Sequence, residues 1–344
     1  MLSKLQKLIK KITERNETCK FHEAAKAIDD FIINNLSQIY IPITRGELWD
    51  EDESKKNRRL AIYAILSQVL KTLDILLHPL CPFTSEYLYQ SVFGGKKSIL
   101  LDKWPQYQES LVNEEIEESF DIMKDVVSVS SAARMKGKLK RRWPLNQAFV
   151  GVSKNQKQKL ESLSPLLMSQ LNVEKFTIFE TQSDGGLEQI LELKQLGLPV
   201  ASIVELERKR IGPKAKAHMG KLVNMFAETN PEEIISSLQK QGHYDFKVDE
   251  ETITLDKEDF LVDFDASQGF AVSKRDNYIV FISTSRNKEM MARGLVKDIA
   301  RRLQTLRKER GYNPTDILGV ASILDLDDES LEMIKEKSED LAFL

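Results

Sequence analysis

Residues 60–83 read LAIYAILSQVLKTLDILLHPLCPF, and this stretch decides the fold of the first part of the chain. Its apolar residues recur at helical spacing, at Ile62, Ile65, Val69, Leu73 and Leu76. That spacing predicts one long amphipathic helix. A His-Pro pair and a further proline then end the helix, and the residues that follow predict a shorter helix that stops at a Gly-Gly pair.

The residues on both sides of this stretch also have the periodicity of helices. Leu5, Ile9 and Ile12 share one face upstream, and Phe21 begins a second set. Downstream, a last long helix begins near Asn113, whose side chain can cap it. Helices joined by short turns bury their apolar faces against one another, so residues 1–135 are predicted to form an antiparallel helical bundle.

The chain changes character after residue 135. Residues 147–152, 154–171 and 173–180 predict a strand, a helix and a second strand, which favours a small βαβ-like domain with a basic junction over residues 136–185. Residues 186–344 predict a C-terminal α+β domain. Its expected helices are 214–227, 231–241, 287–310 and 330–341, and its expected strands are 244–248, 252–255, 269–272, 278–282 and 317–323. The predicted fold class is therefore multidomain, α followed by α+β: a helical bundle and then small mixed α/β domains.

Composition limits the functions that the chain can have. Its 344 residues include 50 Lys+Arg and 53 Asp+Glu, a net charge of -3, so any contact with nucleic acid must come from local clusters of charge. Two cysteines exclude a disulfide scaffold and a cysteine-rich zinc site. No signal peptide is evident, and no apolar run approaches the roughly 18 residues that a membrane span needs. We therefore expect a soluble, cytoplasmic monomer without a membrane partner.

The sequence lacks the motifs of a complete catalyst. Its four histidines occur without the spacing of metal ligands, and no glycine pair belongs to a phosphate-binding loop. The acidic runs, such as residues 249–265, have neither the glycine nor the spacing of a calcium loop and are interpreted as solvated surface. We therefore predict a binding module with no catalytic residue and no metal ligand.

Positive charge is concentrated in two places. Residues 134–142, RMKGKLKRR, are followed by a tryptophan, and a basic cluster beside an aromatic ring can hold a phosphate backbone and stack an unpaired base. The alternative is a solvated helix end with the tryptophan packed in a core. The candidate residues are Arg134, Lys136, Lys138, Lys140, Arg141, Arg142 and Trp143.

The second cluster lies on the predicted helix from residue 287 to residue 310. Its basic residues repeat on a face opposite the apolar stripe, which fits either an RNA-binding face or ordinary solvated surface. The candidates are Arg293, Lys297, Arg301, Arg302, Arg307 and Lys308.

Several motifs of this sequence resemble those of a known family. The segments NLSQIY (35–40), HPLCPFTSE (78–86) and the later Trp104-Pro105 are similar to the helical anticodon-binding domain of class I tRNA synthetases of the Ile/Val/Leu group. KLKRRWPL (138–145) and the 293–309 helix narrow the resemblance to isoleucyl-tRNA synthetase. The strand-rich tail without a zinc ribbon resembles the archaeal/eukaryal type.

The resemblance implies a C-terminal part of such an enzyme that holds the anticodon stem and loop of isoleucine tRNA. It adds a third candidate set at the turn of the bundle: Arg45, Trp49, Arg58 and Arg59. The catalytic and editing domains of the family have no counterpart here, so the N-terminal catalytic part of the same enzyme is an expected partner. ATP and magnesium are expected only there, this part needs no cofactor, and it should be inactive alone. The alternatives are a stand-alone synthetase-like module that binds RNA or protein, and the tail of a valyl-tRNA synthetase.

Overall fold

The computed structural model describes residues 1–48, 52–94, 97–183, 185–249, 251–313, 316 and 328. The chain forms two compact units, Met1–Asp121 and Ile122–Leu344. The predicted strand 317–323, the predicted helix 330–341 and Trp49 lie outside the described residues.

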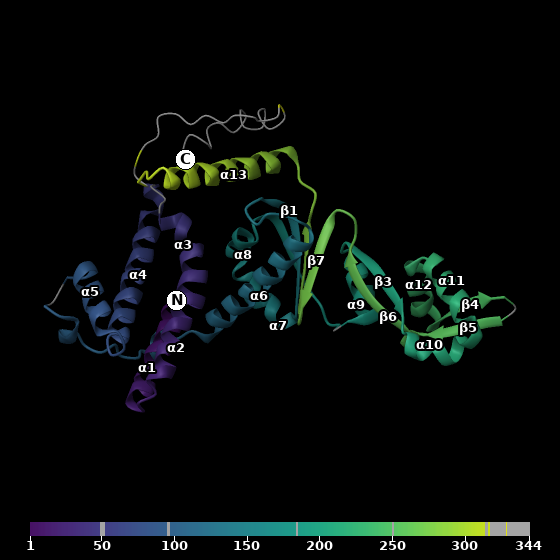
Figure 1. Ribbon diagram of the computed structural model, residues 1–344, viewed down its shortest axis with the longest axis horizontal. Coiled ribbons are helices and arrows are strands. Elements are labelled where there is room, and N and C mark those ends of the chain that lie inside the picture. The colour runs from purple at the N-terminus through teal and green to yellow at the C-terminus, as the bar shows by residue number, and fades with distance from the viewer. Residues whose placement is uncertain are drawn as a thin grey trace. The chain divides into compact units, whose positions relative to one another are not determined.

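Unit 1 is helical, as the periodicity predicts. Its elements are α1 (Leu2–Glu17), α2 (Phe21–Asp30), a π-type segment η1 (Phe31–Tyr40), α3 (Ile41–Leu48), η2 (Glu53–Lys55), α4 (Lys56–Leu77), α5 (Pro82–Val92), η3 (Ile99–Leu101), η4 (Glu109–Leu111) and the start of α6 (Glu114–Lys136). Its core joins α1, α2 and α4 around residues such as Leu5, Ile12 and Leu76, which are fully buried. Figure 1 shows α1, α2 and α4 running beside one another within this unit.

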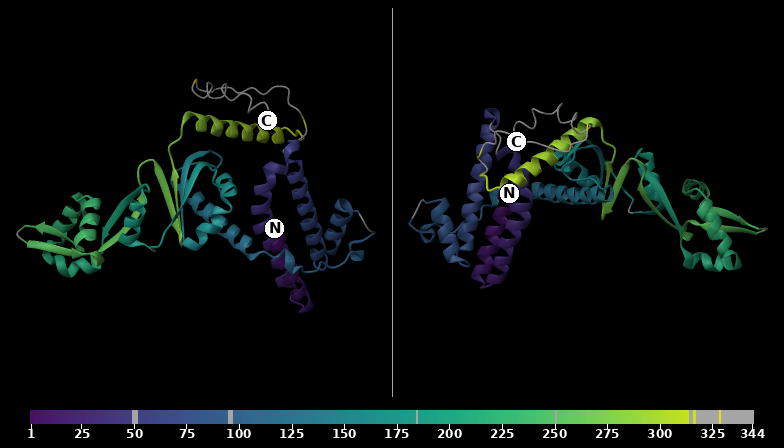
Figure 2. Two further views of the ribbon diagram at one scale, coloured as in Figure 1. Left: turned by 180° about the vertical axis from the view of Figure 1, so that it is seen from behind. Right: turned by 45° about the horizontal axis from the view of Figure 1, so that its top comes forward.

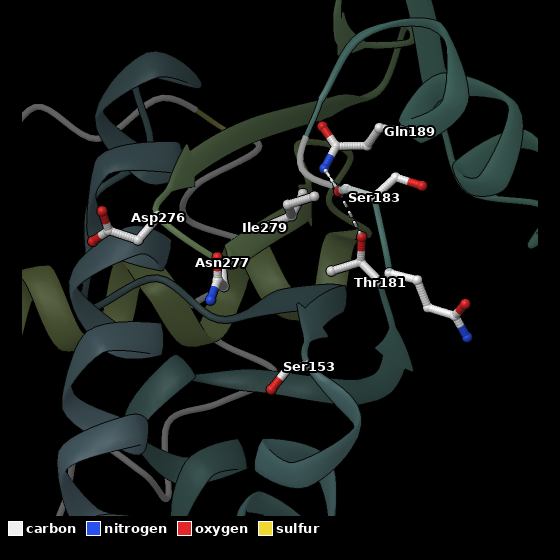
Figure 3. Close-up of a pocket in the computed structure, with 8 residues that line it drawn as sticks. Ser153, Thr181, Ser183, Gln189, Asp276, Asn277 and Ile279 are labelled. Atoms are coloured by element: carbon white, nitrogen blue, oxygen red, sulfur yellow. Dashed lines mark hydrogen bonds between the residues drawn. The ribbon is translucent and has the colours of Figure 1, made fainter.

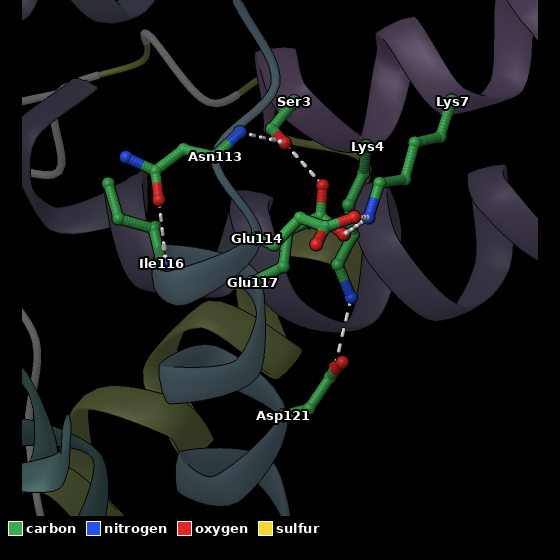
Figure 4. A network of polar contacts seen from close by, with 8 residues as sticks. All are labelled: Ser3, Lys4, Lys7, Asn113, Glu114, Ile116, Glu117 and Asp121. Atoms are coloured by element: carbon green, nitrogen blue, oxygen red, sulfur yellow. Dashed lines mark hydrogen bonds and ion pairs between the residues drawn. The ribbon is translucent and has the colours of Figure 1, made fainter.

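Polar contacts fasten the start of α6 to α1 (Figure 4). The backbone N–H of Asn113 donates to Ser3 Oγ at 2.9 Å, and the Asn113 side chain caps α6 by accepting from the N–H of Ile116. Lys4 pairs with Asp121 and Lys7 with Glu117, both at 2.9 Å. The cap predicted at Asn113 is therefore confirmed, and it acts as part of a network that closes the bundle.

The apolar composition of α4 is higher than expected from the sequence. Residues Glu53–Leu77 are long and apolar enough to cross a membrane by composition alone, a property that core helices of soluble bundles share. The expectation that no stretch meets that criterion was wrong, because alanine, serine and threonine between the large apolar residues do not interrupt the run. Only part of the apolar surface of α4 is buried within the bundle.

One carboxyl group of α4 is buried without a partner. Asp74 is 6% exposed, and neither of its carboxylate oxygens has a hydrogen-bond partner among the described residues. Burial raises its pKa to about 6; the nearby His78 opposes that shift and Glu86 adds to it. Because the folded pKa exceeds the ordinary value of 3.8, the unfolded state ionises first and stability should fall as pH rises from about 4 to 6.

Replacing Asp74 by asparagine is therefore expected to stabilise unit 1 by roughly 2–4 kcal/mol at pH 7.5, since a neutral amide removes the cost of a buried charge. Urea unfolding at pH 7.5 and at pH 4 measures this, with exposed Asp29→Asn as the matched control. The gain should vanish at pH 4. A destabilised variant at pH 7.5 would show that the carboxylate has a favourable partner.

Unit 2 contains the sheets. Its strands are β1 (Leu145–Val152), β2 (Val173–Glu180), β3 (Val200–Leu206), β4 (His243–Val248), β5 (Glu251–Asp256), β6 (Phe260–Ala266), β7 (Phe270–Arg275) and β8 (Tyr278–Ser283). Its helices, after the end of α6, are α7 (Lys154–Glu161), α8 (Ser164–Leu171), α9 (Gly186–Gln195), α10 (Arg208–Ala215), η5 (Lys216–His218), α11 (Met219–Glu228), α12 (Pro231–Gln241), η6 (Lys257–Asp259) and α13 (Lys288–Glu309).

The main sheet has the order β2-β1-β8-β7. Strands β1 and β2 are parallel, with Val150 opposite Ile178, and their crossover through α7 and α8 confirms the predicted βαβ unit. Strand β8 lies antiparallel between β1 and β7, and Asp276, at φ 51°, lies in the turn of the β7–β8 hairpin. The sheet thus takes strands from both sides of residue 185.

Several features of unit 2 differ from the predictions. The expected single helix 154–171 is two helices, α7 and α8. The expected helix 214–227 is instead α10, η5 and α11, because Lys216 has a positive φ of 42° and ends α10 three residues after Pro213. Strands β3 and β6 were not predicted; they pair antiparallel across more than fifty residues of sequence. Figures 1 and 2 show α10, α11 and α12 gathered beside the β4–β5 hairpin.

Candidate nucleic-acid interface

The basic junction, by which we mean residues 134–143 at the end of α6, is held together by one arginine. The guanidinium of Arg134 donates four hydrogen bonds to backbone carbonyls, those of Lys140, Trp143, Leu171 and Asn172, at 2.9–3.2 Å. Arg134 is 3% exposed, and burial lowers its pKa to about 10, with a further lowering by the charge of Arg141. We therefore remove Arg134 from the RNA-contact candidates, since it is buried and both its terminal nitrogens bond to the junction and the end of α8.

Trp143 forms a platform on which α13 docks. A Cβ added to Gly294 would lie 2.4 Å from the indole, so the backbone of α13 rests directly on the ring. The indole N–H donates to Asp298 at 3.1 Å, one helical turn further along. The guanidinium of Arg286 lies 4.7 Å from the ring centroid, within cation–π range. The alternative interpretation of Trp143, in which the tryptophan packs inside the protein, therefore describes this ring.

Asp298 neutralises part of the cluster. Its carboxylate pairs with Lys140 at 2.9 Å and with Arg142. Burial raises the pKa of Asp298, but hydrogen bonds from Lys140 and Trp143 and the charge of Arg142 outweigh it and give a net lowering. Lys140 and Arg142 are thus engaged by α13 in this structure.

The other cations of the junction have no carboxylate partner within the described part of the chain. Lys136, Lys138 and Arg141 are exposed there, and on α13 so are Lys297, Arg301 and Arg302. Partial burial of Lys297 and the charges of Arg293 and Arg134 lower its pKa, so these groups lie close enough to repel one another. We call the seven side chains Lys136, Lys138, Arg141, Arg286, Lys297, Arg301 and Arg302 the docked basic surface.

The remaining candidates of α13 have local partners. Arg293 pairs with Glu174 at 3.0 Å and with Glu289 at 2.6 Å. Arg307 donates to the carbonyls of Asn313 and Asp316 and so fastens the segment after the helix. Lys308 is exposed. Of the six basic positions predicted on this helix, Lys297, Arg301 and Arg302 belong to the docked basic surface together with the junction.

The candidates in unit 1 form a separate set. Arg58 pairs with Glu47, which raises the arginine's pKa and ties the start of α4 to α3. Arg45 is exposed on α3, and Arg59 lies half-buried beside Arg58 on α4. These positions stay predictions for RNA contact.

Sequence reasoning missed a third basic segment. Residues 208–221 contain six Lys/Arg and no acidic residue, the same number of basic residues as the first cluster over a longer stretch. In the structure Arg210 pairs with Glu258, Lys214 with Asp256 and Asp259, and Lys221 with Asp249. Half of its charge is therefore balanced by the acidic run 249–265, which is built into β5, η6 and β6.

A polar hollow of about 270 Å³ lies where β1 and β2 end (Figure 3). Its lining includes Ser153, Thr181, Ser183 and Gln189, and the Gln189 amide donates to the carbonyl of Ser183 at 2.6 Å. Among the described residues that line it, Asp276 is the one charged residue and none is basic. This chemistry does not suit a phosphate, so the hollow is not part of the docked basic surface.

Comparison with known proteins shows what the chain is similar to. Residues 1–149 match the family described as the anticodon-binding domain of tRNA ligase. The chain is 27% identical to the isoleucine–tRNA ligase of Sulfolobus acidocaldarius over 98% of its length, covering 31% of that protein. It is 27% identical to that of Methanopyrus kandleri (98% and 30%) and 28% identical to that of Saccharolobus solfataricus (93% and 31%). The chain thus spans about a third of the length of these curated relatives.

Proposed function

We propose that this chain is the tRNA-binding part of an isoleucine–tRNA ligase, because residues 1–149 match the anticodon-binding domain of tRNA ligase. The whole enzyme would activate isoleucine with ATP and transfer it to its tRNA in the cytoplasm. This part would hold the anticodon stem and loop and orient the tRNA, while the chemistry takes place in the N-terminal catalytic part. Neither the valine enzyme nor a stand-alone module is favoured by the relatives found.

The observation that carries the proposed mechanism is the docked basic surface. Trp143 and Gly294 bring together two segments about 150 residues apart in the sequence. The seven cations of the docked basic surface have no carboxylate partners among the described residues, and such cations gain most from a phosphate. Burial and the charges of Arg293 and Arg134 lower the pKa of Lys297, and a bound phosphate would oppose that shift. Bases of an anticodon loop are unpaired and accessible, so phosphate contacts here would position the loop for base readout elsewhere.

The proposal predicts a charge-specific loss of tRNA binding. Changing Lys136, Lys138 and Arg141 to glutamine should weaken binding and flatten the log–log salt dependence by about 2 units, since each lost phosphate contact accounts for about 0.7–0.9. The loss should be similar for all tRNAs, because phosphate contacts carry no sequence information. Fluorescence anisotropy over a salt series measures both quantities.

The matched control removes three positive charges that already have carboxylate partners. Lys214, Lys221 and Lys257 lie 2.5–2.8 Å from such partners, so their change to glutamine should leave the salt slope unchanged. Equal slopes for the two triple variants would exclude the junction from the binding face.

A further inference from the structure

The outer face of α5 is strongly apolar and exposed. Phe83 is 91% exposed, Tyr87 72% and Val92 63%, and Leu88 lies beside them on the same helix. The adjoining η3 adds exposed Leu100 and Leu101. These six side chains are called the α5 face. Large exposed apolar patches in soluble proteins mark surfaces that contact another molecule or domain.

The inner side of α5 is firmly packed, so the α5 face is presented by a fixed helix. Ser85 and Tyr89 are buried, and the hydroxyl of Tyr89 donates to Asp102 at 2.7 Å. The Oγ of Ser85 lies 2.9 Å from Nδ1 of His78, which ties α5 to the end of α4. Figure 1 shows α5 beside α4 at the edge of unit 1.

The charge of α5 argues against nucleic acid or a lipid surface as the occupant. The helix contains no lysine or arginine, and the exposed Lys97 and Lys103 flank only η3. RNA and anionic membranes are held through larger clusters of such residues. Its one acidic residue, Glu86, is already used: it accepts from Ser98 Oγ at 2.8 Å and from the N–H of Ile99 at 3.1 Å. The α5 face therefore suits an apolar protein surface.

We propose that the α5 face packs against the part of the synthetase polypeptide that lies outside this chain, an inference that rests on the proposed function. The relatives are about three times longer than the region that they share with this chain. Six side chains make a small interface for a free dimer, which needs roughly 800 Å² per partner. A covalently linked domain has a high effective concentration, so a smaller patch suffices.

Hydroxyl-radical footprinting of this chain and of the longer synthetase polypeptide that contains it tests the proposal. Oxidation of Phe83 and Tyr87 should fall at least about fivefold in the longer polypeptide, because the centre of an interface excludes water. Tyr312, half exposed in unit 2, is the control and should not change to that extent. Equal oxidation of Phe83 in both polypeptides would overturn the proposal, and so would protection in this chain alone that depends on its concentration, on added tRNA or on anionic vesicles.

The double variant Phe83→Ser, Tyr87→Ser separates docking from folding. Both side chains are exposed, so the melting temperature of this chain and its affinity for tRNA should stay the same. In the longer polypeptide the aminoacylation rate should fall while tRNA affinity is kept, and an unchanged rate would count against docking. If the longer polypeptide does not aminoacylate at all, the proposed function fails, whereas the protection of Phe83 still decides the docking.

Discussion

Replacing Gly294 by alanine is expected to lower tRNA affinity about tenfold by separating α13 from the junction. A Cβ at this position would lie 2.4 Å from the Trp143 ring, so the helix or the indole must move. Overpacking of this kind costs about 1–3 kcal/mol, which is comparable to what a small docking contact can supply. The loss of Lys297, Arg301 and Arg302 from the surface should also flatten the salt dependence of binding by about 2 units.

Two matched variants make this prediction specific. Gly220→Ala in α11 also changes a helical glycine, but a Cβ there meets nothing within 4 Å, so binding should be unaffected. In a Trp143→Ala background the alanine at 294 should add little further loss, because the clash is gone. Hydrogen exchange of α13 reports docking directly. If α13 keeps its protection from hydrogen exchange in Gly294→Ala while the affinity for tRNA falls, the claim that docking on Trp143 assembles the basic surface is wrong.

Replacing Arg134 by methionine is expected to destabilise unit 2 by roughly 2–4 kcal/mol, since it leaves buried carbonyls without a donor. For a unit of this size that corresponds to a melting temperature lower by roughly 10 °C. Lysine should restore only part of the loss, because one ammonium cannot reach two pairs of carbonyls in the way that the guanidinium does.

The neighbouring Arg141→Met is the control for Arg134→Met. Arg141 is exposed on the same junction, so its replacement should change stability by less than about 0.5 kcal/mol. Differential scanning calorimetry of the three variants and the parent chain measures these differences. Equal melting temperatures for Arg134→Met and Arg141→Met would refute the structural role of Arg134.

The helical bundle and the βαβ unit could be predicted because their signals are local. The spacing of Ile62, Val69 and Leu73 and the cap at Asn113 each occur within a few residues, and the structure confirms the elements that they predict. Strands β3 and β6 could not be paired in advance. The residues of β6 alternate with aspartates, so a run that looks like solvated acidic surface is half of a two-stranded ladder.

The sequence predicts which segments of the candidate interface are basic, but it does not predict the contacts that each basic side chain makes. Charge clusters identified both basic segments, but nothing in the sequence around Arg134 distinguishes a buried clamp from an exposed cation. The role of Asp298 was hidden as well, since its partners lie about 155 residues earlier in the chain. A glycine inside a basic helix, as at Gly294, was the one local signal that could have indicated close packing.

The most direct test of the central claim is the affinity of this chain for isoleucine tRNA and for the same tRNA with a changed anticodon, measured from low to high salt. We predict tighter binding of the unchanged tRNA at every salt concentration, with a steep and nearly equal salt slope for both, because phosphate contacts are shared and base contacts are not. Weak binding of both tRNAs with a shallow slope would contradict the account.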